Sequence, residues 1–125
     1  MFFVQIGEAG RNPYLQRKIG KEGYKSDVGF HLVADRFNGP TNRLNVVPGN
    51  GKRLKDGLPN LNQGPYKQFE NDIFELASKN PGKVELKIEL RYNHGNISAR
   101  PDVIYGSYRL SGSNEWIKKS FINKF

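Results

Sequence analysis

The chain contains no cysteine among its 125 residues. Disulfide bonds, thiolate metal sites and cysteine nucleophiles are therefore excluded together. A protein without cysteine is compatible with reducing and with oxidising compartments, so this absence leaves the location of the protein open.

Long apolar runs are also missing, and acidic residues are comparatively few. No stretch approaches the roughly 18 apolar residues that a membrane-spanning helix needs. Residues 1–6 are too short for a signal peptide and carry no basic start, so we expect a soluble chain. The chain has twelve Asp and Glu and twenty Lys and Arg, which gives a net charge of +8. A polyanion is the natural partner of such a chain, and the charge favours a monomer, but charge alone does not separate nucleic acid from anionic lipid.

The length and patterning predict one α+β domain over residues 1–125. Alternating or β-branched apolar residues predict strands at residues 2–6, 29–34, 44–47, 84–91, 102–110 and 116–122. Helical spacing after Pro65 predicts a helix that stops at Asn80-Pro81-Gly82. Residues 14–25 are interpreted as an irregular or hairpin-like basic segment, and residues 48–64 as a long surface loop. The predicted order is strand, strand, loop, helix and an antiparallel tail.

His31 is a single histidine inside an apolar run formed by Phe30, Leu32, Val33 and Ala34. A histidine in that setting is more often a hydrogen-bonded core residue than a catalyst. As a functional group, its neutral imidazole could take a proton from water near neutral pH. The residue by itself does not decide between these readings.

Asn62 and Glu70 are eight positions apart across the start of the predicted helix. On an ideal helical projection Glu70 lies at the border of the apolar face of the helix, and Asn62 projects from the same side. An amide and a carboxylate held together suit Mg²⁺, which takes oxygen ligands and keeps several waters. The spacing is equally compatible with Asn62 as a helix cap and Glu70 paired with a lysine.

Three sequence blocks follow one another in order: residues 27–40 (DVGFHLVADRFNGP), 44–48 (LNVVP) and 61–70 (LNQGPYKQFE). Together they resemble the DNA/RNA non-specific endonuclease family, and the resemblance extends through Gly82-Lys83-Val84 and Arg100-Pro101 to Asn123. It is closest to the branch that forms the toxin tips of bacterial polymorphic and contact-dependent inhibition systems. The resemblance implies a ββα-metal finger, a strand, loop, strand and helix, packed on an antiparallel sheet.

The resemblance also implies a role for each matching residue. His31 would be the general base, and Asn45 would support the histidine and the site. Asn62 would bind Mg²⁺ directly, or Mn²⁺ in its place, and Glu70 would complete the metal site by orienting water there. The implied reaction is hydrolysis of a phosphodiester bond to a 5′-phosphate and a 3′-hydroxyl, in DNA and/or RNA, with low sequence specificity.

The sequence departs from the family pattern next to the histidine. Phe30 separates Gly29 from His31, and Val28 stands where the family commonly has arginine. Because an extra strand residue would turn the following side chains to the other face, we expect a β-bulge near Gly29. The phosphate-binding residues must come from elsewhere, and the candidates are Arg17, Arg36, Arg43, Lys52 and Arg53.

The leading hypothesis is therefore a Mg²⁺-dependent nuclease that forms the C-terminal module of a larger secreted or surface-delivered toxin. It would act in the target-cell cytoplasm, and an acidic immunity protein would block its basic cleft. One alternative is a metal-independent ribonuclease that uses His31 and His94 on the RNA 2′-hydroxyl. Another is a catalytically inactive nucleic-acid-binding module.

Overall fold

The computed structural model describes residues 2–7, 10–24, 27–42, 44–51 and 64–123. They form an α+β fold, as the sequence predicts. The elements are β1 (Phe2–Phe3), α1 (Pro13–Gly20), β2 (Asp27–His31), β3 (Val46–Asn50), α2 (Pro65–Lys79), β4 (Val84–Arg91), β5 (Val103–Leu110) and β6 (Ile117–Ile122). Within the described segments, no helix is both long enough and apolar enough to span a membrane.

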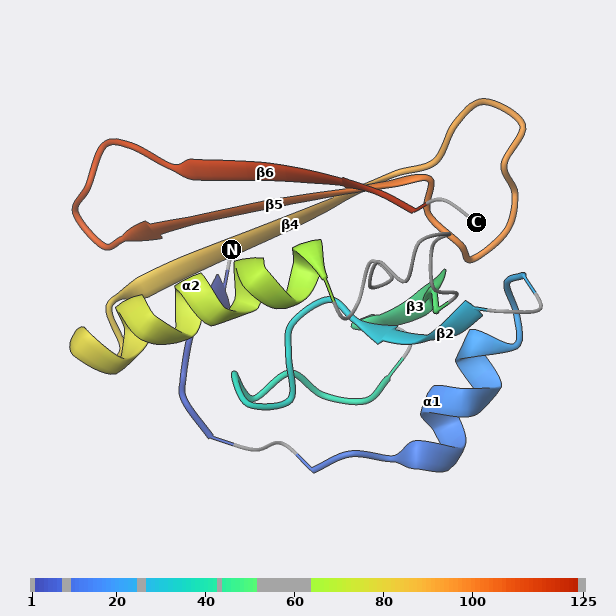
Figure 1. Ribbon diagram of the computed structural model, residues 1–125, viewed down its shortest axis with the longest axis horizontal. Coiled ribbons are helices and arrows are strands. Elements are labelled where there is room, and N and C mark those ends of the chain that lie inside the picture. The colour runs from blue at the N-terminus through green and yellow to red at the C-terminus, as the bar shows by residue number, and fades with distance from the viewer. Residues whose placement is uncertain (1, 8–9, 25–26, 43, 52–63, 124–125) are drawn as a thin grey trace.

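The larger sheet has four strands in the order β1-β4-β5-β6, and all of its pairs are antiparallel. The predicted alternation in β4 is confirmed from Leu86 onwards, because Leu86 is buried whereas Lys87 and Glu89 are exposed. It is wrong at Glu85, which is buried and pairs with Arg109 of β5. The predicted strand at residues 2–6 is shorter, since β1 pairs with β4 through only two residues. Figure 1 shows α2 lying across one face of this sheet.

An aromatic cluster joins α2 to the sheet. Tyr66 and Phe69 on α2 each pack edge-on against Phe121 of β6, with ring centroids 4.8 and 5.3 Å away. A Cβ on Gly106 would lie only 2.5 Å from the Phe69 ring, so glycine is needed where this ring meets β5. The helix predicted from Pro65 to the Asn80-Pro81-Gly82 stop is confirmed, and its buried stripe forms much of the core.

The prediction for residues 14–25 is wrong, because this segment contains the helix α1. Asn12 caps the helix by accepting a hydrogen bond from the Leu15 backbone N–H at 3.0 Å, and Pro13 occupies the first turn. These are helix-start signals. Gly20 and Gly23 look like turn residues in the sequence, but a Cβ on Gly20 would lie 2.5 Å from the Gly29 nitrogen. Gly20 therefore permits close packing of the last turn on β2.

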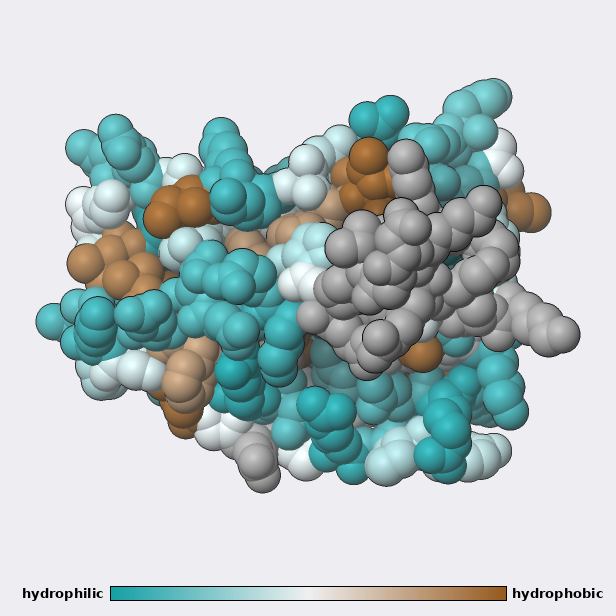
Figure 2. Space-filling model, in the orientation of Figure 1, coloured by the Kyte–Doolittle hydropathy of each residue, from teal (hydrophilic) through white to brown (hydrophobic). Residues whose placement is uncertain are grey.

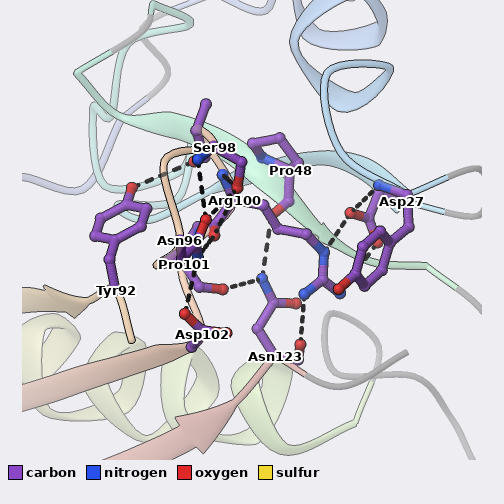
Figure 3. Close-up of polar contacts among 11 residues, drawn as sticks. Asp27, Pro48, Tyr92, Asn96, Ser98, Arg100, Pro101, Asp102 and Asn123 are labelled. Atoms are coloured by element: carbon purple, nitrogen blue, oxygen red, sulfur yellow. Dashed lines mark hydrogen bonds and ion pairs between the residues drawn. The ribbon is translucent and has the colours of Figure 1, made fainter. Parts of the chain in front are cut away.

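The hairpin of β2 and β3 is a separate two-stranded sheet, and Figure 1 shows it between α1 and the larger sheet. A group that we call the Arg100 cluster, formed by Asp27, Arg100 and Asn123, ties the two sheets together (Figure 3). The Arg100 guanidinium donates to the Asp27 carboxylate at 2.5 Å and to the Asn123 backbone carbonyl at 2.7 Å. The Asn123 side-chain amide donates to the carbonyls of Pro48 and Pro101 at 3.1 and 2.8 Å.

Candidate functional site

His31 is the last residue of β2, and its side chain is buried on the face of the hairpin opposite Phe30. Phe30 is completely buried and packs against Tyr66 at 4.6 Å between ring centroids. The strand alternation therefore places the phenyl ring in the core and the imidazole on the other side of the hairpin.

The expected bulge near Gly29 is wrong. Asp27 to His31 pair one for one with Asn50 to Val46, without an unpaired residue. Gly29 serves a different purpose: a Cβ there would collide with the Gln16 backbone carbonyl of α1. The Gln16 side-chain amide also donates to the Gly29 carbonyl at 2.8 Å. Glycine at this position thus allows α1 to lie against β2.

One ring nitrogen of His31 is held by the loop between β2 and β3. The His31 Nε2 lies 3.1 Å from the Thr41 hydroxyl, which also accepts the Asn12 backbone N–H at 3.2 Å. A hydroxyl can accept two hydrogen bonds, so Thr41 can receive both Asn12 N–H and Nε2–H. In that tautomer Nδ1 carries the free lone pair and can accept a proton from water.

Asn45 supports the segment after the histidine by hydrogen bonds to the backbone of that segment. Its side-chain oxygen accepts the Val33 N–H at 2.8 Å, and its amide donates to the carbonyls of Val33 and Pro40, both at 2.9 Å. The Asn45 carbonyl accepts the Leu32 N–H at 2.8 Å. These four bonds fix the chain on the C-terminal side of His31.

Glu70 lies on α2 one turn after Tyr66 and is half-buried, in agreement with the helical projection. The Tyr66 hydroxyl donates to the Leu32 carbonyl at 2.5 Å, which fastens the first turn of α2 to the residue after His31. Burial raises the pKa of Glu70 to about 7, even though the charges of Arg36, Lys67 and Arg11 lower it. The carboxylate is therefore short of compensating positive charge.

Several predicted site residues fall outside the described segments. These are Asn62, Arg43, Lys52 and Arg53. Of the remaining arginines, Arg17 is exposed in the last turn of α1. Arg36 donates to the Asn71 side chain at 2.8 Å, and its guanidinium lies 4.9 Å from the Phe74 ring centroid. Arg36 is thus already engaged along α2.

Arg11 is a further candidate site residue that the sequence patterns do not single out. Burial lowers the pKa of His31, and the positive charge of Arg11 lowers it further, whereas Asp35 opposes both effects. The same Arg11 charge also lowers the pKa of Glu70. Its guanidinium is 3.9 Å from the Asp35 carboxylate and its side chain is 62% exposed. In the sequence, the pair Asn12-Pro13 is a helix-start signal, and it places Arg11 immediately before the helix cap.

The described part of the chain contains no group of three or more His, Asp or Glu side chains arranged to hold a metal. It does contain Glu70, a half-buried carboxylate whose pKa is raised by burial. Mg²⁺ is commonly held by one or two carboxylates together with waters, so the donor chemistry of Glu70 suits this ion. His94 lies elsewhere, exposed in the connection between β4 and β5.

Comparison with known proteins shows the family of this chain. The sequence pattern of the DNA/RNA non-specific endonuclease family matches residues 4–109, which include β2, β3, α2 and nearly all of β5. The match covers His31, Asn45, Glu70 and Arg11 as well as the segment that contains Asn62. Membership implies a hydrolase that cleaves nucleic acids. This chain belongs to the DNA/RNA non-specific endonuclease family.

Proposed function

We propose that this protein is a divalent-metal-dependent nuclease that hydrolyses phosphodiester bonds in DNA and RNA with low sequence specificity. The observation that carries the proposal is the bond between the two elements of the site: the Tyr66 hydroxyl of α2 donates to the carbonyl of Leu32, the residue after His31, at 2.5 Å, which holds the helix that carries Glu70 against the strand that ends at His31. The positive charge of Arg11 lowers the pKa of both His31 and Glu70, as expected for groups that lie in one region.

His31 acts as the general base in this proposal. With Nε2–H donated to Thr41, Nδ1 takes a proton from water, and the water oxygen attacks phosphorus. The bond from phosphorus to the 3′-oxygen breaks, and a proton from solvent completes the 3′-hydroxyl. Because water is the nucleophile, a 2′-hydroxyl is not needed. A divalent cation, when bound, would supply electrostatic stabilisation of the charge that develops in the transition state.

The β2–β3 hairpin and α2 constitute the ββα-metal finger of the proposed enzyme. Glu70 would hold the cation from α2, and Asn62 is the second proposed ligand. Two observations support Glu70: burial of its carboxylate and the fastening of α2 to the His31 strand through Tyr66. Mg²⁺ is the proposed cation, with Mn²⁺ as a substitute.

Metal removal provides the direct test of this function. Plasmid DNA and a structured RNA are incubated with the protein in Mg²⁺, in Mn²⁺ and in EDTA. We expect both substrates to be cut with either metal, EDTA to abolish cutting, and excess Mg²⁺ to restore it. Cleavage of RNA alone that persists in EDTA would instead identify the metal-independent ribonuclease. Intact substrates under all conditions, with retained binding, would identify an inactive binding module.

The biological role that we propose is a toxin module, carried at the C-terminal end of a larger secreted or cell-surface-delivered protein. It would act in the cytoplasm of a target bacterium as a monomer. The net charge of +8 supports an acidic immunity protein as its inhibitor. Expression in a bacterial cytoplasm should degrade cellular nucleic acid and stop growth, and normal growth with an active enzyme present would contradict the role.

We propose that the exposed Arg11 guanidinium stabilises negative charge on the phosphate in the transition state. Its replacement by alanine is then expected to lower kcat/KM about 100- to 1000-fold, the usual effect of removing one such group. Arg11→Lys should recover part of this loss, because lysine keeps the charge but not the planar fork. Arg91→Ala is the matched control, since Arg91 is exposed on β4. Steady-state cleavage of a short labelled duplex measures the effect. Equal activity of Arg11→Ala and Arg91→Ala would remove Arg11 from the site.

The pKa of His31 should respond in opposite directions to its two charged neighbours. Arg11 lowers this pKa, so Arg11→Ala should raise it, and Asp35 raises it, so Asp35→Asn should lower it. Because the base must be neutral, the acid limb of the pH–rate profile should move up for Arg11→Ala and down for Asp35→Asn. NMR titration of the His31 ring measures the pKa without any need for cleavage. Shifts of the same sign in both variants would contradict the described electrostatics.

A further inference from the structure

The segment from Gly10 to Lys21 carries four cations, Arg11, Arg17, Lys18 and Lys21, and no acidic residue. Its helix α1 packs on the β2–β3 hairpin through a buried face that includes Ile19 and Gly20. The opposite face is exposed and presents Tyr14, Arg17, Lys18 and Lys21 at one-turn spacings. In the orientation of Figure 1, hydrophilic side chains cover the surface over α1 (Figure 2).

Tyr14 is the unusual member of this face, because 70% of this large aromatic side chain is exposed. Among the described residues, no aromatic ring or guanidinium stacks on it. Tyr24, at the other end of the segment, differs: the Arg100 guanidinium covers its ring at 4.1 Å. Tyr14 therefore offers an accessible ring next to cations, which is the combination that binds single-stranded nucleic acid.

The start of α1 is tied to the candidate base. The Asn12 N–H, at the helix cap, donates to the same Thr41 hydroxyl that holds His31 Nε2. Arg11 precedes this cap, and its charge acts on both His31 and Glu70. A strand that lies along the exposed face of α1 would therefore reach the catalytic region at the N-terminal end of the helix.

We propose that the exposed face of α1 is a docking track for a single nucleic-acid strand, with a base stacked on Tyr14 and phosphates bound by Arg17, Lys18 and Lys21. This inference rests on the proposed nuclease function and adds a preference for single-stranded or unpaired substrate. In a duplex the bases are already stacked on each other, so Tyr14 gains no base to bind.

Binding measured in the His31→Ala background tests the track without cleavage. Fluorescence anisotropy of a labelled 12-nucleotide single strand is compared with that of the matching duplex. Tyr14→Ala should weaken single-strand binding roughly five- to 150-fold, the range for loss of one stacked base, and duplex binding less than about twofold. Equal effects on both substrates, or no effect on the single strand, would overturn the stacking role.

The cationic part of the track is tested by Arg17→Ala/Lys18→Ala. Loss of two phosphate contacts should reduce the salt slope of single-strand binding by about 1.4 and the affinity about tenfold at moderate salt. The control Lys118→Ala/Lys119→Ala makes the same charge change at exposed positions on β6 and should leave the slope unchanged. If the control lowers the salt slope and the affinity as much as the α1 variant does, the binding is a general effect of net charge and the α1 track is wrong.

These outcomes are separable from failure of the nuclease proposal. A protein that binds single strands through α1 but cuts nothing would retain the track and lose the proposed activity. A protein that cuts with Mg²⁺ but binds single strands equally well without Tyr14 and the two α1 cations would retain the proposed activity and lose the track. Unchanged thermal unfolding of the variants confirms that they fold, as expected for exposed positions.

Discussion

Replacement of His31 by alanine should reduce metal-dependent cleavage of plasmid DNA by about two to four orders of magnitude, the usual contribution of a general base. The loss corresponds to about 3–5 kcal/mol of transition-state stabilisation. The physical reason is that Nδ1 is the atom that takes the proton from water, and the alanine side chain has no proton acceptor. The effect should appear in kcat, because His31 acts on water and contributes little to substrate affinity.

His94→Ala is the matched control for this prediction. His94 is the second histidine of the chain and is exposed in the connection between β4 and β5. That connection meets β2 at Asp27, which pairs with Arg100. His31 lies at the other end of β2, four positions from Asp27, which is about 13 Å along the strand at the usual rise per residue. We expect His94→Ala to retain full activity. Loss of RNA cleavage in both variants, with EDTA present, would favour the two-histidine ribonuclease.

Binding separates a catalytic from a structural role of His31. His31→Ala should bind nucleic acid nearly as well as the parent protein, and its unfolding midpoint should change little compared with the loss of activity. Retention of more than about a tenth of the parent activity would place the base elsewhere. Loss of binding and stability together would mean that His31 mainly supports the hairpin.

Replacement of Arg100 by alanine is expected to have the largest effect on stability, about 3–5 kcal/mol, because it leaves a buried carboxylate without its partner. The Asp27 side chain is fully buried and that of Arg100 is 6% exposed. Arg100 also donates to the Asn123 carbonyl and stacks on Tyr24. For a chain of 125 residues such a loss is a large share of the total stability of about 5–15 kcal/mol.

The contacts of the Arg100 guanidinium also predict the effect of a conservative variant, Arg100→Lys. The guanidinium reaches both Asp27 oxygens and the Asn123 carbonyl at once, which an ammonium group cannot reproduce (Figure 3). Arg100→Lys should therefore recover only part of the lost stability. Urea unfolding followed by tryptophan fluorescence and circular dichroism measures each difference.

A double variant and a surface control complete the test. Asp27→Ala/Arg100→Ala should be less destabilised than the sum of its single variants, because neither charge is then left buried alone. Lys79→Ala breaks the exposed pair with Glu75 and should change stability by less than about 1 kcal/mol. If Arg100→Ala costs no more than Lys79→Ala, the cluster does not hold the two sheets together.

Regular patterns in the sequence predicted the regular parts of the fold. The strict alternation from Val84 to Arg91 specifies one buried face, and the structure has β4 over the same residues. The apolar spacing after Pro65 predicted α2, including the half-buried position of Glu70. These elements could be predicted because burial of one face is a local consequence of periodicity.

Short elements held by contacts far apart in the sequence could not be predicted in the same way. The helix α1 has eight residues, and its last residue, Gly20, permits close packing on β2, although in the sequence it resembles a turn signal. The bulge near Gly29 was inferred from the departure from the family pattern at Phe30, whereas the pairing with β3 is continuous. In both cases the close approach of α1 and β2 decides what glycine does.

The sequence by itself, with no cysteine and a net charge of +8, excluded thiol chemistry and indicated a polyanionic partner. Its motifs led to His31, Asn45 and Glu70, because residue type and spacing are properties of the chain. Only the tertiary structure brought Arg11 to both His31 and Glu70, and only it revealed the Thr41 bond to the imidazole. Charge effects and hydrogen bonds depend on distance in space, which one-dimensional spacing does not contain.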